Sequence, residues 1–154
     1  MVNSRLILIA CAMNAAISSG VSPIQPSNPE VALAPFAVIG DQGGDLRKVA
    51  DQCLEQLAAS LSAKNVKVAK LPGLDEKTLA RAKPARWAVL GRFARVKEIV
   101  QIELRLMEVS TGDEIRSYSN GISSPNEISV FSTRVADRIA LFVQEHRSGS
   151  GAPR

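Results

Sequence analysis

The chain has 154 residues, of which 45% are hydrophobic and 22% are charged, and its formal net charge is +4. This length and balance are typical of one globular domain with a real core, which must be aliphatic because aromatic residues make up only 4%. The 19 basic residues are scattered and not interleaved with aromatic residues, so we expect no nucleic-acid partner.

Residues 1–19 have the features of an export signal. Arg5 supplies a positive charge, residues 6–13 are apolar, and small residues suited to cleavage follow. The apolar run is too short to span a membrane. Two alternatives stay open. Residues 8–11, LIAC, resemble a bacterial lipobox, in which Cys11 would be lipidated, and the run could instead form a buried amino-terminal helix.

Residues 20–33 are rich in Pro, Ser and Asn, which predicts an extended linker. We predict that residues 34–146 form the folded domain. The segment 147–154, RSGSGAPR, has the composition of a disordered tail.

The folded part begins with a short apolar run at residues 34–40, which predicts a buried central strand. A Gly-rich loop follows, and Asp45 is placed to cap a helix whose apolar face runs from Leu46 to Leu61. Cys53 falls on that face. The loop lacks the Lys and the Ser or Thr of a P-loop, so a simple strand-to-helix turn is expected. A second short strand is predicted at residues 66–71.

The clearest pattern lies at residues 86–119, where apolar and polar side chains alternate in three runs. It predicts a three-stranded antiparallel meander with a polar break at residues 95–98. The second turn falls at residues 110–113, where Gly112 supplies a positive φ. One face of the meander, called the dry face here, should be buried in the core, and the other, called the wet face, should be exposed to solvent. The wet face carries Arg92, Gln101, Glu103 and Arg105.

Two more helices complete the prediction. Asp75 can cap a short helix at residues 76–82. Residues 124–127, SPNE, form a capping box at the start of a long final helix, whose apolar stripe is Ile128, Phe131, Val135, Ile139 and Phe142. The expected fold class is therefore α/β (α+β), with helices packed on a mixed sheet of about five strands in the order β-α-β-α-β-β-β-α. The helix between the first two strands favours parallel pairing.

No motif in the chain predicts a reaction. The only histidine, His146, lies near the end of the chain, which argues against histidine-based triads and most zinc sites. Neither Cys11 nor Cys53 has metal-ligand spacing around it. Carboxylate pairs such as Asp41 and Asp45 have ordinary capping roles. We therefore expect no enzymatic activity, no cofactor and no metal.

Part of the meander resembles a known family. Residues 85–93, ARWAVLGRF, resemble a strand of the TolB amino-terminal domain, and residues 100–108 and 109–115 resemble its next strand and its Thr-Gly turn. The similarity covers about residues 34–145 but is specific only at 87–118. Glu108 and Val109 stand where an Asp-Ala pair is common, Arg116 stands where Trp is common, and no propeller sequence follows.

This resemblance implies a periplasmic or secreted domain, or an outer-membrane lipoprotein, that binds other cell-envelope proteins. Membrane contact is expected only through a lipid on Cys11. The alternative is a small-ligand-binding or sensing domain with a crevice beside residues 40–45. The predicted partner-binding residues lie on two loops and on the wet face; they are Asp41, Asp45, Arg92, Gln101, Glu103, Arg105 and Thr111.

Overall fold

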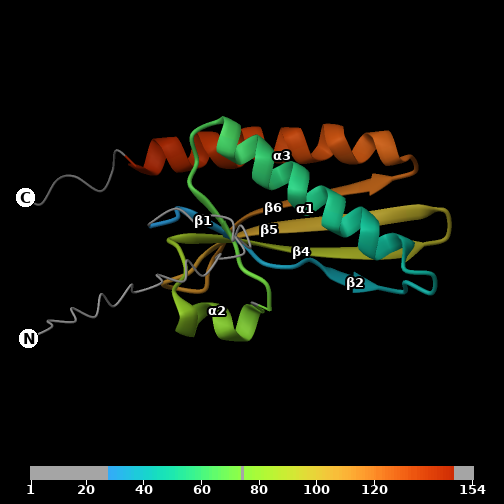
Figure 1. Cartoon of the computed structure of the whole chain (residues 1–154), viewed down its shortest axis with the longest axis horizontal. Coiled ribbons are helices and arrows are strands. Elements are labelled where there is room, and N and C mark those ends of the chain that lie inside the picture. Colours follow the sequence, from blue (N-terminus) through green and yellow to red (C-terminus); the bar gives the residue numbers. More distant parts are fainter. Residues whose placement is uncertain (1–27, 74, 148–154) are drawn as a thin grey trace, which may run out of the picture.

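The computed structural model describes residues 28–73 and 75–147. Within these residues, six strands form one mixed sheet and three helices pack on it, which confirms the predicted fold class (Figure 1). The elements are β1 (Val31–Leu33), β2 (Ala37–Ile39), α1 (Asp45–Ala63), β3 (Val68–Lys70), α2 (Glu76–Ala82), β4 (Trp87–Val96), β5 (Ile99–Glu108), β6 (Glu114–Ile122) and α3 (Pro125–Arg147). The predictions for residues 1–27, including the export signal and the lipidation of Cys11, lie outside the described residues.

The predicted meander is confirmed. β4 and β5 pair antiparallel without a register shift from Trp87 opposite Glu108 to Val96 opposite Ile99. β6 pairs with β5 and continues past the predicted end at residue 119. Gly112 has φ 76° in the second turn, as expected. The dry face faces α1 and α3, and its side chains Trp87, Val89, Phe93, Ile102, Leu104 and Leu106 are buried.

The strand predicted at residues 34–40 is confirmed only in part, because β2 lies within that range but is preceded by a strand that was not predicted. The chain forms two short strands, β1 and β2, that both pair in parallel with β4. β1 includes residues that the sequence placed in the linker, and its three residues are buried. β2 is mostly exposed rather than central. Pro35 lies between the two strands, and it lacks the backbone N–H that a continuous ladder needs.

The break between β1 and β2 explains Gly91. The Phe36 ring turns in from this break, is 2% exposed and stacks on Phe93 with ring centroids 5.6 Å apart. A Cβ added at Gly91 would lie 2.7 Å from Leu104 Cδ2 and still closer to the Phe36 ring. The ladder is regular at this position. Gly91 therefore marks a close approach of an aromatic ring and not a β-bulge.

The helices cover the two faces of the sheet unequally (Figure 1). α1 and α3 bury the larger core on one face, where the predicted apolar stripes of both helices lie. α2 covers only one end of the other face, where Leu79 packs with Ala32, Ala88 and Val109. Met107 lies on this second face as well, and it is only 5% exposed because it packs with Ala34 and Leu90. The rest of this face has no helix over it among the described elements.

The helix caps differ in part from the prediction. The side chain of Asp41, not that of Asp45, accepts hydrogen bonds from the first turn of α1, from Leu46 N at 3.3 Å and Arg47 N at 3.0 Å. Asp75 caps α2, as predicted, and the structure adds a reciprocal hydrogen bond with Thr78 that completes a capping box. At α3, the Glu127 carboxylate accepts hydrogen bonds from the N–H and Oγ of Ser123 and not from Ser124, so the capping box predicted at residues 124–127 is wrong by one residue.

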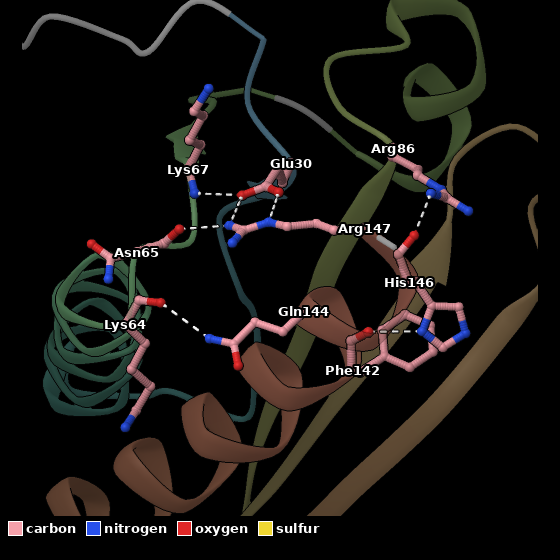
Figure 2. Close-up of polar contacts among 9 residues, drawn as sticks. All are labelled: Glu30, Lys64, Asn65, Lys67, Arg86, Phe142, Gln144, His146 and Arg147. Carbon is pink, nitrogen blue, oxygen red and sulfur yellow. Dashed lines mark hydrogen bonds and ion pairs between the residues drawn. The ribbon is translucent and has the colours of Figure 1, made fainter. Parts of the chain in front are cut away.

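A polar clasp joins the two ends of the described chain (Figure 2). We use this name for Glu30, Asn65, Lys67 and Arg147. The Arg147 guanidinium donates two hydrogen bonds to the Glu30 carboxylate and a third, of 2.6 Å, to the Asn65 carbonyl. The backbone N–H of Lys67 donates to the same carboxylate at 3.0 Å. Arg147 is thus part of α3 and not of a tail that begins at residue 147.

Candidate partner-binding surfaces

The predicted partner-binding residues do not form one site. Arg92, Gln101, Glu103 and Arg105 lie on the sheet face that α2 partly covers. Asp41 and Asp45 lie at the loop before α1, near the β4–β5 turn. Thr111 lies in the β5–β6 turn, at the opposite end of β5. The structure therefore brings four of the seven residues together and separates the other three.

The uncovered end of the sheet face carries charged and apolar side chains together. We call it the open face and define it by Ile39, Arg92, Val96, Ile99, Gln101 and Glu103. Arg92 donates to Glu103 across the β4–β5 ladder at 2.9 Å. Three large apolar side chains lie exposed beside this pair, with 51% of Ile39, 51% of Val96 and 44% of Ile99 accessible. Such a mixed and uncovered patch is typical of a protein-binding surface.

Arg105 lies between the open face and α2. Its guanidinium is 3.1 Å from the Glu76 carboxylate of α2 and 3.9 Å from that of Glu114 on β6. A cavity of about 450 Å³ extends from here past Arg92 and Glu103. Arg105 thus links β5 to α2 and to β6 through ion pairs within the chain that are partly exposed.

The loop before α1 is occupied by its own hydrogen bonds. Burial raises the pKa of the Asp41 carboxyl, but the backbone N–H donors of Arg47 and Leu46 outweigh this and the net effect lowers that pKa. The backbone N–H groups of Leu46 and Arg47, in the first turn of α1, thus already donate to a carboxylate of the same chain. Asp45 lies outside this arrangement and forms a 3.7 Å ion pair with Lys48. The hollow beside the loop, of about 430 Å³, is lined by polar side chains that include Arg95 and Lys97.

Thr111 has a role in its own turn. Its Oγ1 accepts a 3.2 Å hydrogen bond from the backbone N–H of Asp113, and Gly112 N donates to Glu108 O at 2.8 Å. These bonds close the turn that Gly112 makes possible. Nothing in this geometry directs the Thr111 side chain toward a partner.

A second surface was not predicted from the sequence. A groove of about 550 Å³ runs between β6 and α3, and Arg116, Arg134 and Arg138 line it with Tyr118 and Phe131. We call it the arginine groove. Arg116 is the residue that departs from the TolB pattern, and Arg134 and Arg138 lie outside the apolar stripe of α3. Only the packing of α3 beside β6 brings the three together, so no spacing in the sequence could have shown the groove.

The described residues contain no group of three or more His, Cys, Asp or Glu side chains placed to hold a metal ion. Cys53 is fully buried between α1 and α3, with its Sγ 3.2 Å from Ser132 Oγ. Burial raises the pKa of this thiol to about 11. None of the helices in the described ranges has both the length and the apolar character needed to cross a bilayer.

Comparisons with known proteins show the fold. No protein-family model matches the chain, and no curated protein matches it. Among solved structures, the PelC dodecamer from Paraburkholderia phytofirmans is 18% identical with a TM-score of 0.53, over 70% of this chain and 84% of that chain. A homolog of a neuraminyllactose-binding hemagglutinin from Helicobacter pylori is 12% identical with a TM-score of 0.50, over 87% and 97%. TolB from Acinetobacter baumannii, the family predicted from the sequence, is also among the matches, with 16% identity and a TM-score of 0.49 over 76% of this chain and 29% of TolB. At these identities the matches concern the fold alone.

Proposed function

We propose that this protein is a non-enzymatic interaction module of the cell envelope, located in the periplasm or secreted, that binds another envelope protein through the open face. The observation that carries the proposal is the exposure of Ile39, Val96 and Ile99 on a sheet face that no described helix covers. Apolar side chains that are half exposed and adjacent on a rigid sheet lose contact with water when a partner covers them.

The energy available from this patch fits a specific but modest interaction. Burying the exposed half of three large aliphatic side chains stabilises a complex by about 2–4 kcal/mol. The Arg92–Glu103 pair at the patch edge contributes orientation more than affinity, because exposed ion pairs are worth about 1 kcal/mol or less. The envelope location comes from the predicted export signal and from the resemblance to the TolB amino-terminal domain. The PelC match has the same fold in an assembly of many copies, so a binding role is one that this fold supports.

The proposal is tested by site-specific photocrosslinking in the envelope of the native cell. A photoreactive residue at Val96 should give a discrete crosslinked product with a second protein, and Ile39→Asp should abolish it. The matched control is the same probe at Val130, which is 59% exposed on the outer side of α3. Equal or absent crosslinking at the two positions would argue against the open face as the binding surface.

Location needs a separate measurement. Mass spectrometry of the mature amino terminus from isolated envelope should show a chain shortened near residue 19, or a chain that begins with a lipidated Cys11. An unprocessed chain found only in the cytoplasm would refute the envelope role.

A further inference from the structure

The arginine groove lies beside an open edge of the sheet. β6 pairs only with β5 among the described strands, so its other side carries backbone N–H and C=O groups that no described strand pairs. The strand runs from Glu114 to Ile122, contains no Pro, and lies along α3 (Figure 1). A strand edge of this length is long enough to pair with an added segment.

The groove also has an unbalanced charge. Arg116, Arg134 and Arg138 are all exposed, and none forms an ion pair with a carboxylate in the described part of the chain. Arg134 and Arg138 lie one turn apart on α3, and the Arg116 guanidinium carbon lies 5.8 Å from the centre of the Phe142 ring. These three cations flank one side of the β6 edge.

Tyr118 lines the groove and carries a hydrogen-bond donor beneath its surface that is unpaired among the described residues. Its hydroxyl oxygen is buried and has no hydrogen-bond partner among the described residues. Burial raises the pKa of this hydroxyl, so it keeps its proton at neutral pH. A protonated hydroxyl among arginines suits a carboxylate, which only accepts hydrogen bonds.

We propose that the arginine groove and the free edge of β6 bind an acidic segment of a partner protein, which adds to the sheet as an extended strand. Side chains of an added strand alternate between the two faces of the sheet. Every second residue of the segment then points toward α3, where a carboxylate meets the guanidinium groups, while the backbone pairs with β6.

The acidic segment cannot come from an undescribed part of this chain. All 15 Asp and Glu residues fall within residues 30–145, inside the described ranges. A second copy is also a poor occupant. Antiparallel pairing of two β6 edges would bring two arginine grooves together, and the other outer strand, β3, is a three-residue edge without a carboxylate. The charge therefore selects a different, acidic protein. This groove is separate from the open face, so its test does not depend on the function proposed above.

The test uses the purified chain and the synthetic peptide Thr-Glu-Thr-Glu-Thr-Glu-Thr. We expect saturable binding by fluorescence anisotropy that weakens as salt is raised, and slower amide hydrogen exchange in residues 114–122. The double variant Arg134→Ala/Arg138→Ala should weaken binding about tenfold, since each exposed ion pair is worth up to about 1 kcal/mol. The matched control is Arg81→Ala/Arg95→Ala, which removes the same charge from exposed positions elsewhere and should change affinity by less than about twofold.

Two further probes separate strand addition from simple charge attraction. A peptide N-methylated at alternate residues keeps its charge but cannot pair with β6, so it should bind at least about tenfold more weakly. Heparin tests for a general polyanion site. Three results would each overturn the proposal. The first is equal binding of the N-methylated peptide, and the second is no saturable binding of the acidic peptide. The third is heparin binding that depends on the same arginines and leaves the amides of β6 unprotected.

Discussion

The contact at Gly91 gives a prediction whose sign depends on the packing. A glycine within a strand weakens it, and replacing that glycine by Ala ordinarily stabilises a strand by about 0.5–1 kcal/mol. Here the new methyl group would overlap the Phe36 ring and lie 2.7 Å from Leu104 Cδ2. Both neighbours are almost completely buried, at 2% and 0% exposure, so neither can swing into water.

We therefore expect Gly91→Ala to lower the free energy of unfolding by about 1–2 kcal/mol. This value is an overpacking cost of about 1–3 kcal/mol less the gain in strand propensity. For a domain of this size it corresponds to a fall in Tm of about 4–8 °C, measured by thermal unfolding and by urea titration.

The matched control is Gly121→Ala in β6. The nearest atom to an added Cβ there is Ile99 Cγ2 at 3.2 Å, and that side chain is 44% exposed and free to move. We expect this variant to be neutral or slightly stabilised. Adding Phe36→Leu should make room at Gly91, so that the double variant shows a favourable coupling of about 1 kcal/mol. A stabilised Gly91→Ala variant, or one with no coupling to position 36, would refute the packing argument.

Three other predictions concern single side chains. The Cys53 thiol should resist a thiol-reactive dye at pH 8 in the folded chain and react after unfolding in urea, because it is buried and its pKa is raised to about 11; rapid labelling without unfolding would contradict this. The hydrogen bond from Arg147 lowers the pKa of the Glu30 carboxyl below its ordinary value of 4.5. The stabilisation that the ionised carboxylate gives to the fold is therefore fully present above pH 4.5 and is lost as the pH falls through the lowered pKa. Glu30→Gln should cost about 0.5–1 kcal/mol at pH 7 and nothing near pH 2, measured by urea unfolding at each pH; a cost that is independent of pH would exclude this linkage. Asp41→Ala should lower the midpoint of urea unfolding more than Asp45→Ala does, since only the Asp41 side chain accepts hydrogen bonds from the first turn of α1; the reverse order would support the cap predicted from the sequence.

Alternation and capping chemistry predicted most of the fold because these signals are local. The meander, α2 and the stripes of α1 and α3 follow from side-chain periods and from caps such as Asp75. The amino-terminal part was only partly predicted, because Pro35 divides one apolar stretch into two short strands that both pair with β4, and the apolar pattern alone reads as a single strand. The helix cap was misassigned since Asp41 reaches α1 across a loop, a contact set by loop geometry.

The candidate sites were less predictable than the fold. The wet face of the meander was identified, since Arg92, Gln101 and Glu103 do lie on one open surface. The apolar residues of this surface, Ile39 and Val96, were not predicted to be exposed. Their exposure depends on where α2 ends, and no residue pattern in the strands indicates that. The arginine groove combines residues from β6 and α3 that are far apart in the sequence, and such a surface exists only after the two elements pack.

The polar clasp has a topological consequence. Because Glu30 and Arg147 are in contact, the two ends of the folded unit lie side by side (Figure 2). A short Gly-Ser linker would therefore join them without crossing the sheet. The exposed turn at Lys97, at the far end of β4, then becomes a natural place to open the backbone. A circular permutant that starts at residue 98 and ends at residue 97 should keep the same architecture while its termini emerge beside the open face.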